Sequence, residues 1–356
     1  MIKIPAVVFM AVSAFAGNAQ NSISTYLNNH HYAFSVDNGF DQPTSDSLKR
    51  KLGEYKIILQ AQGGSHLLNI YKKLGFVWIK FLNANFGLTH FFVEYGHSAD
   101  IFMNRSMQTG DTSYCNLYGK SFWKSLYTYN SNLPPGSKLN CFGIDFERPC
   151  TYVKALRSLL PETIAPADIQ PAVELIKNAN DSSRDCNYII NINDRLKKDL
   201  ATYKQQFVEY LGDRYFDFER IVLNKGDCND VYKDRNKHMA SAFLSFDEAF
   251  NQPVYYGELG EAHTVLINRN TASILNKSEK FKGKLCVINV YCYNCIIDSK
   301  QLLNWPFRKI EKDILAYFLP YCETDFTLFD LTGNTELTEK YNAYGQFLII
   351  AKNQGQ

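Results

Sequence analysis

Short apolar runs alternate with longer segments of helical periodicity in the first part of the chain. The run at 56–62 is rich in β-forming residues, and the segment 67–85 repeats its apolar positions near helical spacing. A second apolar run at 89–94 and a second helical segment at 98–107 follow. Strand, helix and strand within about 40 residues is typical of the βαβ unit of a parallel sheet.

The same pattern predicts the rest of the sheet and one long helical interruption. Further strands are expected at 138–146, 253–258, 284–291, 326–331 and 346–351. The interval 161–250 has helical periodicity and many charges, with helices expected at 194–211 and 237–250. We therefore expect an α/β fold, a mainly parallel β-sheet flanked by helices with a helical cap inserted at about 161–250.

The N-terminus has a targeting pattern. Lys3 precedes a run at 4–15 that is apolar apart from Ser13, and small residues follow it. The run is shorter than the about 20 residues that span a bilayer. We expect a signal peptide at 1–19, a single domain at 20–356, export to the periplasm or the extracellular space, and no stable membrane insertion after cleavage.

Composition and charge narrow the choice of partners. The 38 basic and 36 acidic residues are interspersed and give a net charge of +2, so we expect no nucleic-acid partner. The 25 Phe and 23 Tyr residues suit a thick core and the walls of a small-molecule cleft. The oligomeric state is left open by the sequence.

The nine cysteines are spread along the chain. Cys292 and Cys295 form a Cys-x-x-Cys pair, but a zinc site needs a second pair at suitable spacing, and the sequence has none. We interpret the cysteines as structural thiols or disulfides, and we expect no metal and no cofactor.

Polar and ionisable side chains follow four of the expected strands. Because ligands of parallel α/β sheets bind beyond the carboxyl ends of the strands, these side chains are expected at one rim. Groups of this kind, held close together, support acid and base chemistry. They are Gln62 and His66 after the first strand, Glu94 after the second, Asp145, Glu147 and Arg148 after the third, and Tyr256, Glu258, Glu261 and His263 at the fourth.

The order of these segments resembles the erythromycin-esterase family from about residue 55 to residue 293. The resemblance rests on the strand, turn and histidine at 57–66, Phe86-Gly87, the strand to Glu94, Asn104-Arg105, Thr109-Gly110-Asp111, Phe142-Gly143-Ile144-Asp145 and the segment 257–263.

The resemblance implies an ester hydrolase in which a histidine activates water without a metal. By position, His66, Glu94 and His263 match the catalytic residues, with His66 as the general base and Glu94 as the carboxylate that orients it. The substrate-binding residues are then expected to be Gln62, Asp145, Glu147, Arg148, Tyr256, Glu258 and Glu261.

The chain departs from the family pattern at two positions. Gly63 stands where the family has a first-loop Glu, and Gly260 stands where it has a second His, although Glu258 and Glu261 flank Gly260. The sequence has no Gly-x-Ser-x-Gly elbow at a strand end, which argues against a serine nucleophile.

Two other interpretations remain beside the hydrolase. The glycine at position 63 favours a non-catalytic binding protein that retains the cleft. The same histidines and carboxylates are also the ligand types of zinc, iron or haem sites.

Overall fold

The computed structural model describes residues 22–63, 69–113, 119–183, 185–224, 234–297, 301–305, 316–341 and 345–352. Residues 1–21 lie outside this part, so the signal peptide stays a prediction. His66 also lies outside it.

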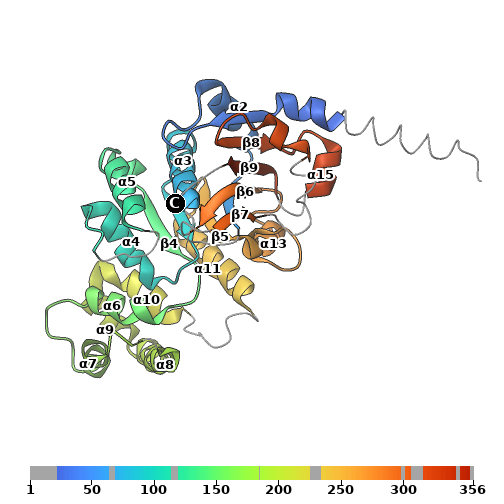
Figure 1. Ribbon diagram of the computed structural model, residues 1–356. Helices are drawn as coiled ribbons and strands as arrows, with labels where there is room; N and C mark the ends of the chain where they lie inside the picture. The colour runs from blue at the N-terminus through green and yellow to red at the C-terminus, as the bar shows by residue number, and fades with distance from the viewer. Residues whose placement is uncertain are drawn as a thin grey trace, which may run out of the picture.

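The described strands form a nine-stranded sheet with the order β1-β8-β9-β6-β2-β5-β3-β4, and β7 pairs with β6 (Figure 1). The pairs from β9 to β4 are all parallel, whereas β1, β7 and β8 pair in antiparallel fashion. The expected mainly parallel α/β fold is confirmed. The strands are β1 His31–Phe34, β2 Ile57–Gln62, β3 His90–Val93, β4 Asn140–Gly143, β5 Tyr255–Gly260, β6 Leu285–Ile297, β7 Gln301–Trp305, β8 Phe326–Asp330 and β9 Phe347–Lys352.

Alternating side chains of the central strands face two separate layers of helices. On β2, Ile58 packs in a core that contains residues of α3, α4 and α5, while Ile57 and Leu59 pack in a second core with residues of α11 and α13. Both faces of the parallel strands are therefore apolar, as expected for a sheet that is covered on each side. The helices are α3 Asn69–Phe86, α4 Ser98–Thr109, α5 Lys120–Ser131, α11 Arg235–Phe250 and α13 Thr271–Lys277.

At the β1 end of the sheet a third core joins β6, β8 and β9 to α15 Thr335–Tyr341. The helix α2 Gln42–Leu52 precedes β2, and Asp41 caps it by accepting a hydrogen bond from Thr44 N at 2.9 Å. The sequence pattern missed β1 and β7, which are strands of four and five residues.

In its described part, the chain between β4 and β5 contains helices joined by loops and no strand, and Figure 1 shows α6 to α9 grouped away from the sheet. The helix expected at 194–211 is in fact two helices, which meet at Tyr203, where the backbone leaves the helical region. The helix expected at 237–250 begins two residues earlier, at Arg235. The helices are α6 Pro149–Leu159, α7 Gln170–Asn178, α8 Cys186–Thr202, α9 Lys204–Leu211 and α10 Tyr215–Leu223.

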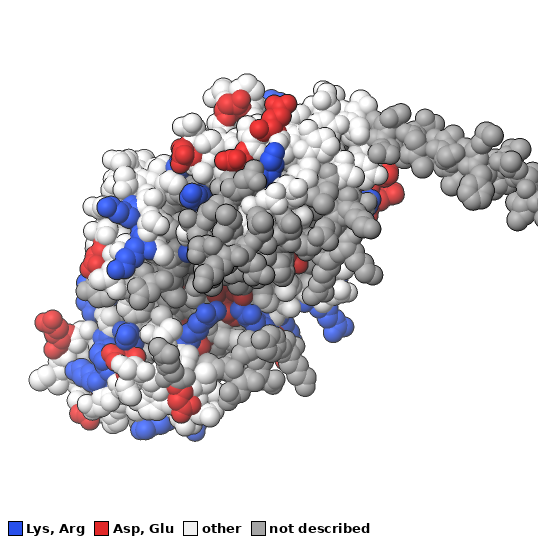
Figure 2. All heavy atoms as spheres, viewed as in Figure 1, with Lys and Arg blue, Asp and Glu red and all other residues white. Residues whose placement is uncertain are grey.

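Basic and acidic side chains are mixed over the face shown in Figure 2, without one continuous patch of either sign. Among the described residues, no helix combines the length and the apolar character needed to cross a bilayer.

The end of β4 lies directly against the segment that follows β3. A Cβ on Gly143 would overlap with Tyr95 O and lie 2.6 Å from Gly96 O. In this position the Gly143 N–H donates to Asp100 Oδ1 at 2.5 Å, and the Asp145 N–H donates to Tyr95 O at 2.8 Å. The absence of a side chain at Gly143 thus permits the close spacing of two neighbouring strand ends.

We expect Gly143→Ala to lower the free energy of unfolding by about 1–3 kcal/mol, because the added methyl group forces backbone segments apart. Urea denaturation followed by circular dichroism measures this change. The matched control is Gly136→Ala, since a Cβ there meets nothing within 4 Å. Equal unfolding free energies of the two variants would contradict the inference that the missing side chain at Gly143 permits the close spacing of the two strand ends.

Candidate functional site

The candidate site lies at the carboxyl ends of four adjacent parallel strands, in the order β2, β5, β3 and β4. Glu94 directly follows β3, and Asp145 comes two residues after β4. His263 lies on the short helix α12 Glu261–Thr264, which directly follows β5. The rim expected from the sequence therefore brings these three side chains to one edge of the sheet.

Arg235 joins the two carboxylates. Its Nη2 atom lies 2.5 Å from Glu94 Oε1 and 2.6 Å from Asp145 Oδ2, and its Nε donates to Asp145 Oδ1 at 2.9 Å. The side chains of Arg235, Glu94 and Asp145 are only 16%, 11% and 4% exposed. Against the effect of burial, hydrogen bonds and the charges of the two carboxylates raise the pKa of Arg235. The guanidinium is thus a fixed positive charge within the site.

Glu94 has two further partners. Its Oε2 accepts a hydrogen bond from the Gly260 N–H at 2.7 Å, and its Oε1 lies 3.5 Å from His263 Nε2. Burial by itself raises the pKa of Glu94, but His263, Arg235 and the Gly260 N–H together lower it to about 2. Glu94 is therefore an ionised carboxylate at neutral pH, and its role is to orient and stabilise positive groups.

The hydrogen bonds of Asn236 define which nitrogen of His263 carries a proton. Asn236 Oδ1 accepts from Thr271 N at 3.1 Å and from Thr271 Oγ1 at 2.9 Å, which identifies this atom as the amide oxygen. The same oxygen lies 2.6 Å from His263 Nδ1, so Nδ1 must donate to it. The other ring nitrogen, Nε2, faces Glu94.

Arg235 and Asn236, which are the first two residues of α11, were missed by the sequence analysis. An arginine near the start of an expected helix carries no pattern that distinguishes it from a surface residue. One signal was available, because Glu94 and Asp145 follow neighbouring strands and two buried carboxylates require a cation.

Gln62, Tyr256 and Glu258 form a second, fully internal cluster. Gln62 Nε2 donates to Glu258 Oε2 at 2.8 Å, and the Tyr256 hydroxyl lies 3.5 Å from Glu258 Oε1. A Cβ on Gly75 of α3 would overlap with the Glu258 carboxylate, so the helix covers this group directly. Tyr256 and Glu258 are thus buried, and their expected contact with substrate stays a prediction.

Glu147 is also buried and bonded to the protein. It accepts hydrogen bonds from Ser98 N at 3.1 Å, at the start of α4, and from Asn224 Nδ2 at 2.6 Å. Burial, which is the largest effect on it, raises the pKa of Glu147 despite these bonds. These bonds join the start of α4 to Asn224, and the expected contact of Glu147 with substrate stays a prediction.

Arg148 is the accessible cation of the site. Its side chain is 46% exposed, its Nη2 lies 3.7 Å from Asp145 Oδ2, and its guanidinium stacks 4.7 Å from the centre of the Tyr95 ring. Glu261, at the start of α12, is partly exposed. These two side chains retain the access that a substrate-binding role requires.

No group of three or more metal-binding side chains occurs in the described part of the chain. Cys292 and Cys295 are buried thiols on β6, and Cys186 is disulfide-bonded.

Comparison with solved structures finds the same fold in three proteins at low sequence identity. A Bacillus cereus protein superposes with a TM-score of 0.71 at 14% identity, over 94% of this chain and 98% of that chain. A mutant of the erythromycin esterase EreC in its open conformation gives 0.61 at 11% identity, over 88% and 94%. A succinoglycan biosynthesis protein gives 0.66 at 12% identity, over 95% and 98%.

The chain has an erythromycin-esterase-like fold. No family model and no curated protein matches its sequence. The likeness to the three solved structures extends over 88–95% of the chain.

Because the pKa of Glu94 is lowered to about 2, the free energy of unfolding is expected to fall as the pH is lowered. In the unfolded chain this carboxyl has an ordinary pKa of about 4.3, so the unfolded state takes up the proton first as the pH falls. The contribution of Glu94 is complete above about pH 5 and is lost toward pH 2, a change on the order of 2–3 kcal/mol. Urea denaturation at several pH values measures it.

The control for that measurement is Glu94→Gln, which has no carboxyl to titrate at this position. Its unfolding free energy is expected to fall less steeply over the same pH range than that of the original chain. Parallel pH profiles of the two proteins would contradict the lowered pKa.

Removal of Arg235 takes away the buried cation that two buried carboxylates share. We expect Arg235→Met to lower the free energy of unfolding by about 3–5 kcal/mol at neutral pH. Adding Asp145→Asn to this variant restores part of the loss, because the two changes act on one ion pair.

Lys204→Met provides the comparison at the surface. The Lys204 ammonium pairs with Glu219 at 3.0 Å, but its side chain is 65% exposed, so its loss is expected to cost at most about 1 kcal/mol. Similar losses of unfolding free energy in Lys204→Met and Arg235→Met would show that the buried ion pair stabilises the fold no more than the exposed one.

Proposed function

We propose that the protein is a hydrolase of the erythromycin-esterase type that cleaves an ester-like bond in a small molecule. The observation that carries this proposal is the contact of the Glu94 carboxylate with His263 Nε2 at 3.5 Å, within a charge network at the carboxyl ends of the parallel strands. An imidazole beside a carboxylate that is ionised at neutral pH is an arrangement suited to proton transfer.

In the proposed reaction, water adds to the carbonyl carbon and the bond to the leaving oxygen breaks. His66 takes the proton from the water, and His263 Nε2 delivers a proton to the leaving oxygen, so that an acid and an alcohol are released. Glu94 stabilises the imidazolium form of His263 by its negative charge. Asn236 holds the ring through Nδ1 and keeps Nε2 directed at Glu94.

The fixed charges around Glu94 support the proposal that Glu94 orients His263 and does not itself take the proton from water. A carboxylate with a pKa of about 2 is a weak base at neutral pH, whereas an imidazole is an effective one. Arg148 and Glu261 are the accessible polar residues that we propose for substrate binding. We also propose that the protein is exported, on the basis of its N-terminal sequence alone.

The second candidate is a non-catalytic protein that binds a small molecule at the same strand ends. Gly63 favours this candidate, because it stands where the family has a first-loop carboxylate. The backbone carbonyl of Gly63 accepts a hydrogen bond from the Tyr71 hydroxyl at 2.6 Å. The two candidates differ in whether the bound ester is cleaved.

The deciding experiment measures turnover of a panel of aryl and macrocyclic esters by the purified protein in the presence of a chelator. We expect His66→Ala and His263→Gln each to lower kcat/KM by about 100-fold to 10,000-fold, because each removes a proton-transfer group. The control is His30→Gln, since His30 lies near β1 and bonds Tyr26 O, away from the site.

An inactive original chain that gains activity on Gly63→Glu would support the binding protein and reject the hydrolase. Unchanged turnover in both the His66 and the His263 variants would reject the proposed mechanism.

A further inference from the structure

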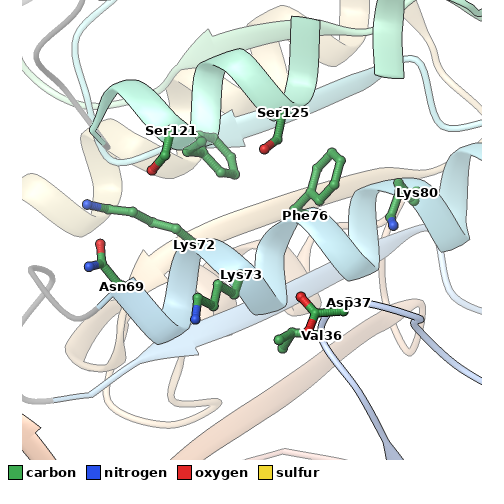
Figure 3. Close-up of a pocket in the computed structure, with 10 residues that line it drawn as sticks. Val36, Asp37, Asn69, Lys72, Lys73, Phe76, Lys80, Ser121 and Ser125 are labelled. Atoms are coloured by element: carbon green, nitrogen blue, oxygen red, sulfur yellow. The ribbon is translucent and has the colours of Figure 1, made fainter. Parts of the chain in front are cut away.

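A cavity of about 390 Å³ lies between α3 and α5, apart from the network of Glu94 and His263 (Figure 3). Its volume is within the range of small-molecule sites. Lys72, Phe76 and Lys80 line it from α3, where a spacing of four residues places them on one face. Ser121 and Ser125 line it from α5 with the same spacing.

Positive charge dominates the lining of the cavity. Lys72, Lys73 and Lys80 all line it, against the single carboxylate of Asp37, which is exposed. Within the described residues none of the three lysines forms an ion pair. The ammonium of Lys80 lies 4.7 Å from the centre of the Phe76 ring, so one wall combines a cation with an apolar surface.

Lys72 is held in an electrostatically unfavourable position. A Cβ on Gly119, the residue that precedes α5, would lie 3.5 Å from Lys72 Nζ, and Figure 3 shows Lys72 extending toward Ser121. The ammonium therefore lies at the N-terminus of α5, where the helix dipole is positive and favours anions. Burial lowers the pKa of Lys72, and the attraction of Glu258 only partly opposes this effect.

An anion in the cavity would relieve this repulsion, because it attracts both the ammonium and the helix terminus. The buried ring of Phe122 and the partly buried ring of Phe76 supply apolar surface beside the charge. A ligand that matches both features has a charged head and an apolar body.

We propose that this cavity is a binding site for an amphiphilic anion, a carboxylate or phosphate attached to a short apolar chain, with Lys72 as the residue that contacts the anionic head. This site does not depend on the proposed hydrolysis, since none of its lining residues belongs to the network of Glu94 and His263.

Isothermal titration calorimetry with octanoate tests the proposal, beside 1-octanol as the neutral analogue and acetate as the head group alone. We expect octanoate to bind at least about tenfold more tightly than either analogue and to bind more weakly at high salt. Lys72→Met is expected to weaken octanoate binding about tenfold or more, because it keeps the chain length and removes the charge.

Two further variants make the test specific. Lys124→Met changes an exposed lysine of α5 that does not line the cavity, and it is expected to leave octanoate binding unchanged. Ser125→Trp places a large ring in the cavity from an exposed helix position and is expected to abolish binding.

A Glu94→Gln variant that still binds octanoate would place the ligand outside the proposed active site, as the proposal requires. Equal affinity for octanoate and 1-octanol would overturn the proposal. Undiminished octanoate binding in both Lys72→Met and Ser125→Trp would overturn it as well.

Discussion

The Arg235 guanidinium holds two carboxylates that arrive from different strands, and the geometry of the site depends on this contact. Glu94 follows β3, Asp145 follows β4, and both side chains are almost completely buried. Without the cation, two negative charges would be desolvated close to one another, which is among the most costly arrangements in a protein interior. The guanidinium fork bonds both groups at once and fixes their directions.

The other contacts of the site follow from this fixed carboxylate. Glu94 contacts Arg235 and His263 through Oε1 and accepts a hydrogen bond from the Gly260 N–H through Oε2. The neighbouring residue of Arg235, Asn236, orients the imidazole from the same helix end. The first turn of α11 thus supplies both the charge and the orientation, although the helix itself packs on the sheet through apolar residues.

Much of the fold and part of the site could be predicted from the sequence. The apolar runs that became β2 to β5, β8 and β9 were found within a few residues of their bounds, whereas β6 extends six residues beyond its expected end. Short apolar runs of this kind can be recognised from the local sequence, because strands that are covered on both faces are apolar along their length. The rule that ligands bind at the carboxyl ends of parallel strands selected Glu94 and His263, and the structure places them in contact. The roles of these side chains remain predictions.

What the sequence by itself determined is the class of fold and the rim on which ionisable groups gather. Only the tertiary structure decided which of them meet, since Glu94 and Arg235 lie 141 positions apart and no periodic pattern links them. It also decided that Glu147 and Glu258 are covered, because burial depends on which helix packs over a strand end. Periodicity records whether a position faces a core, whereas a contact between distant residues arises only from the packing of whole elements.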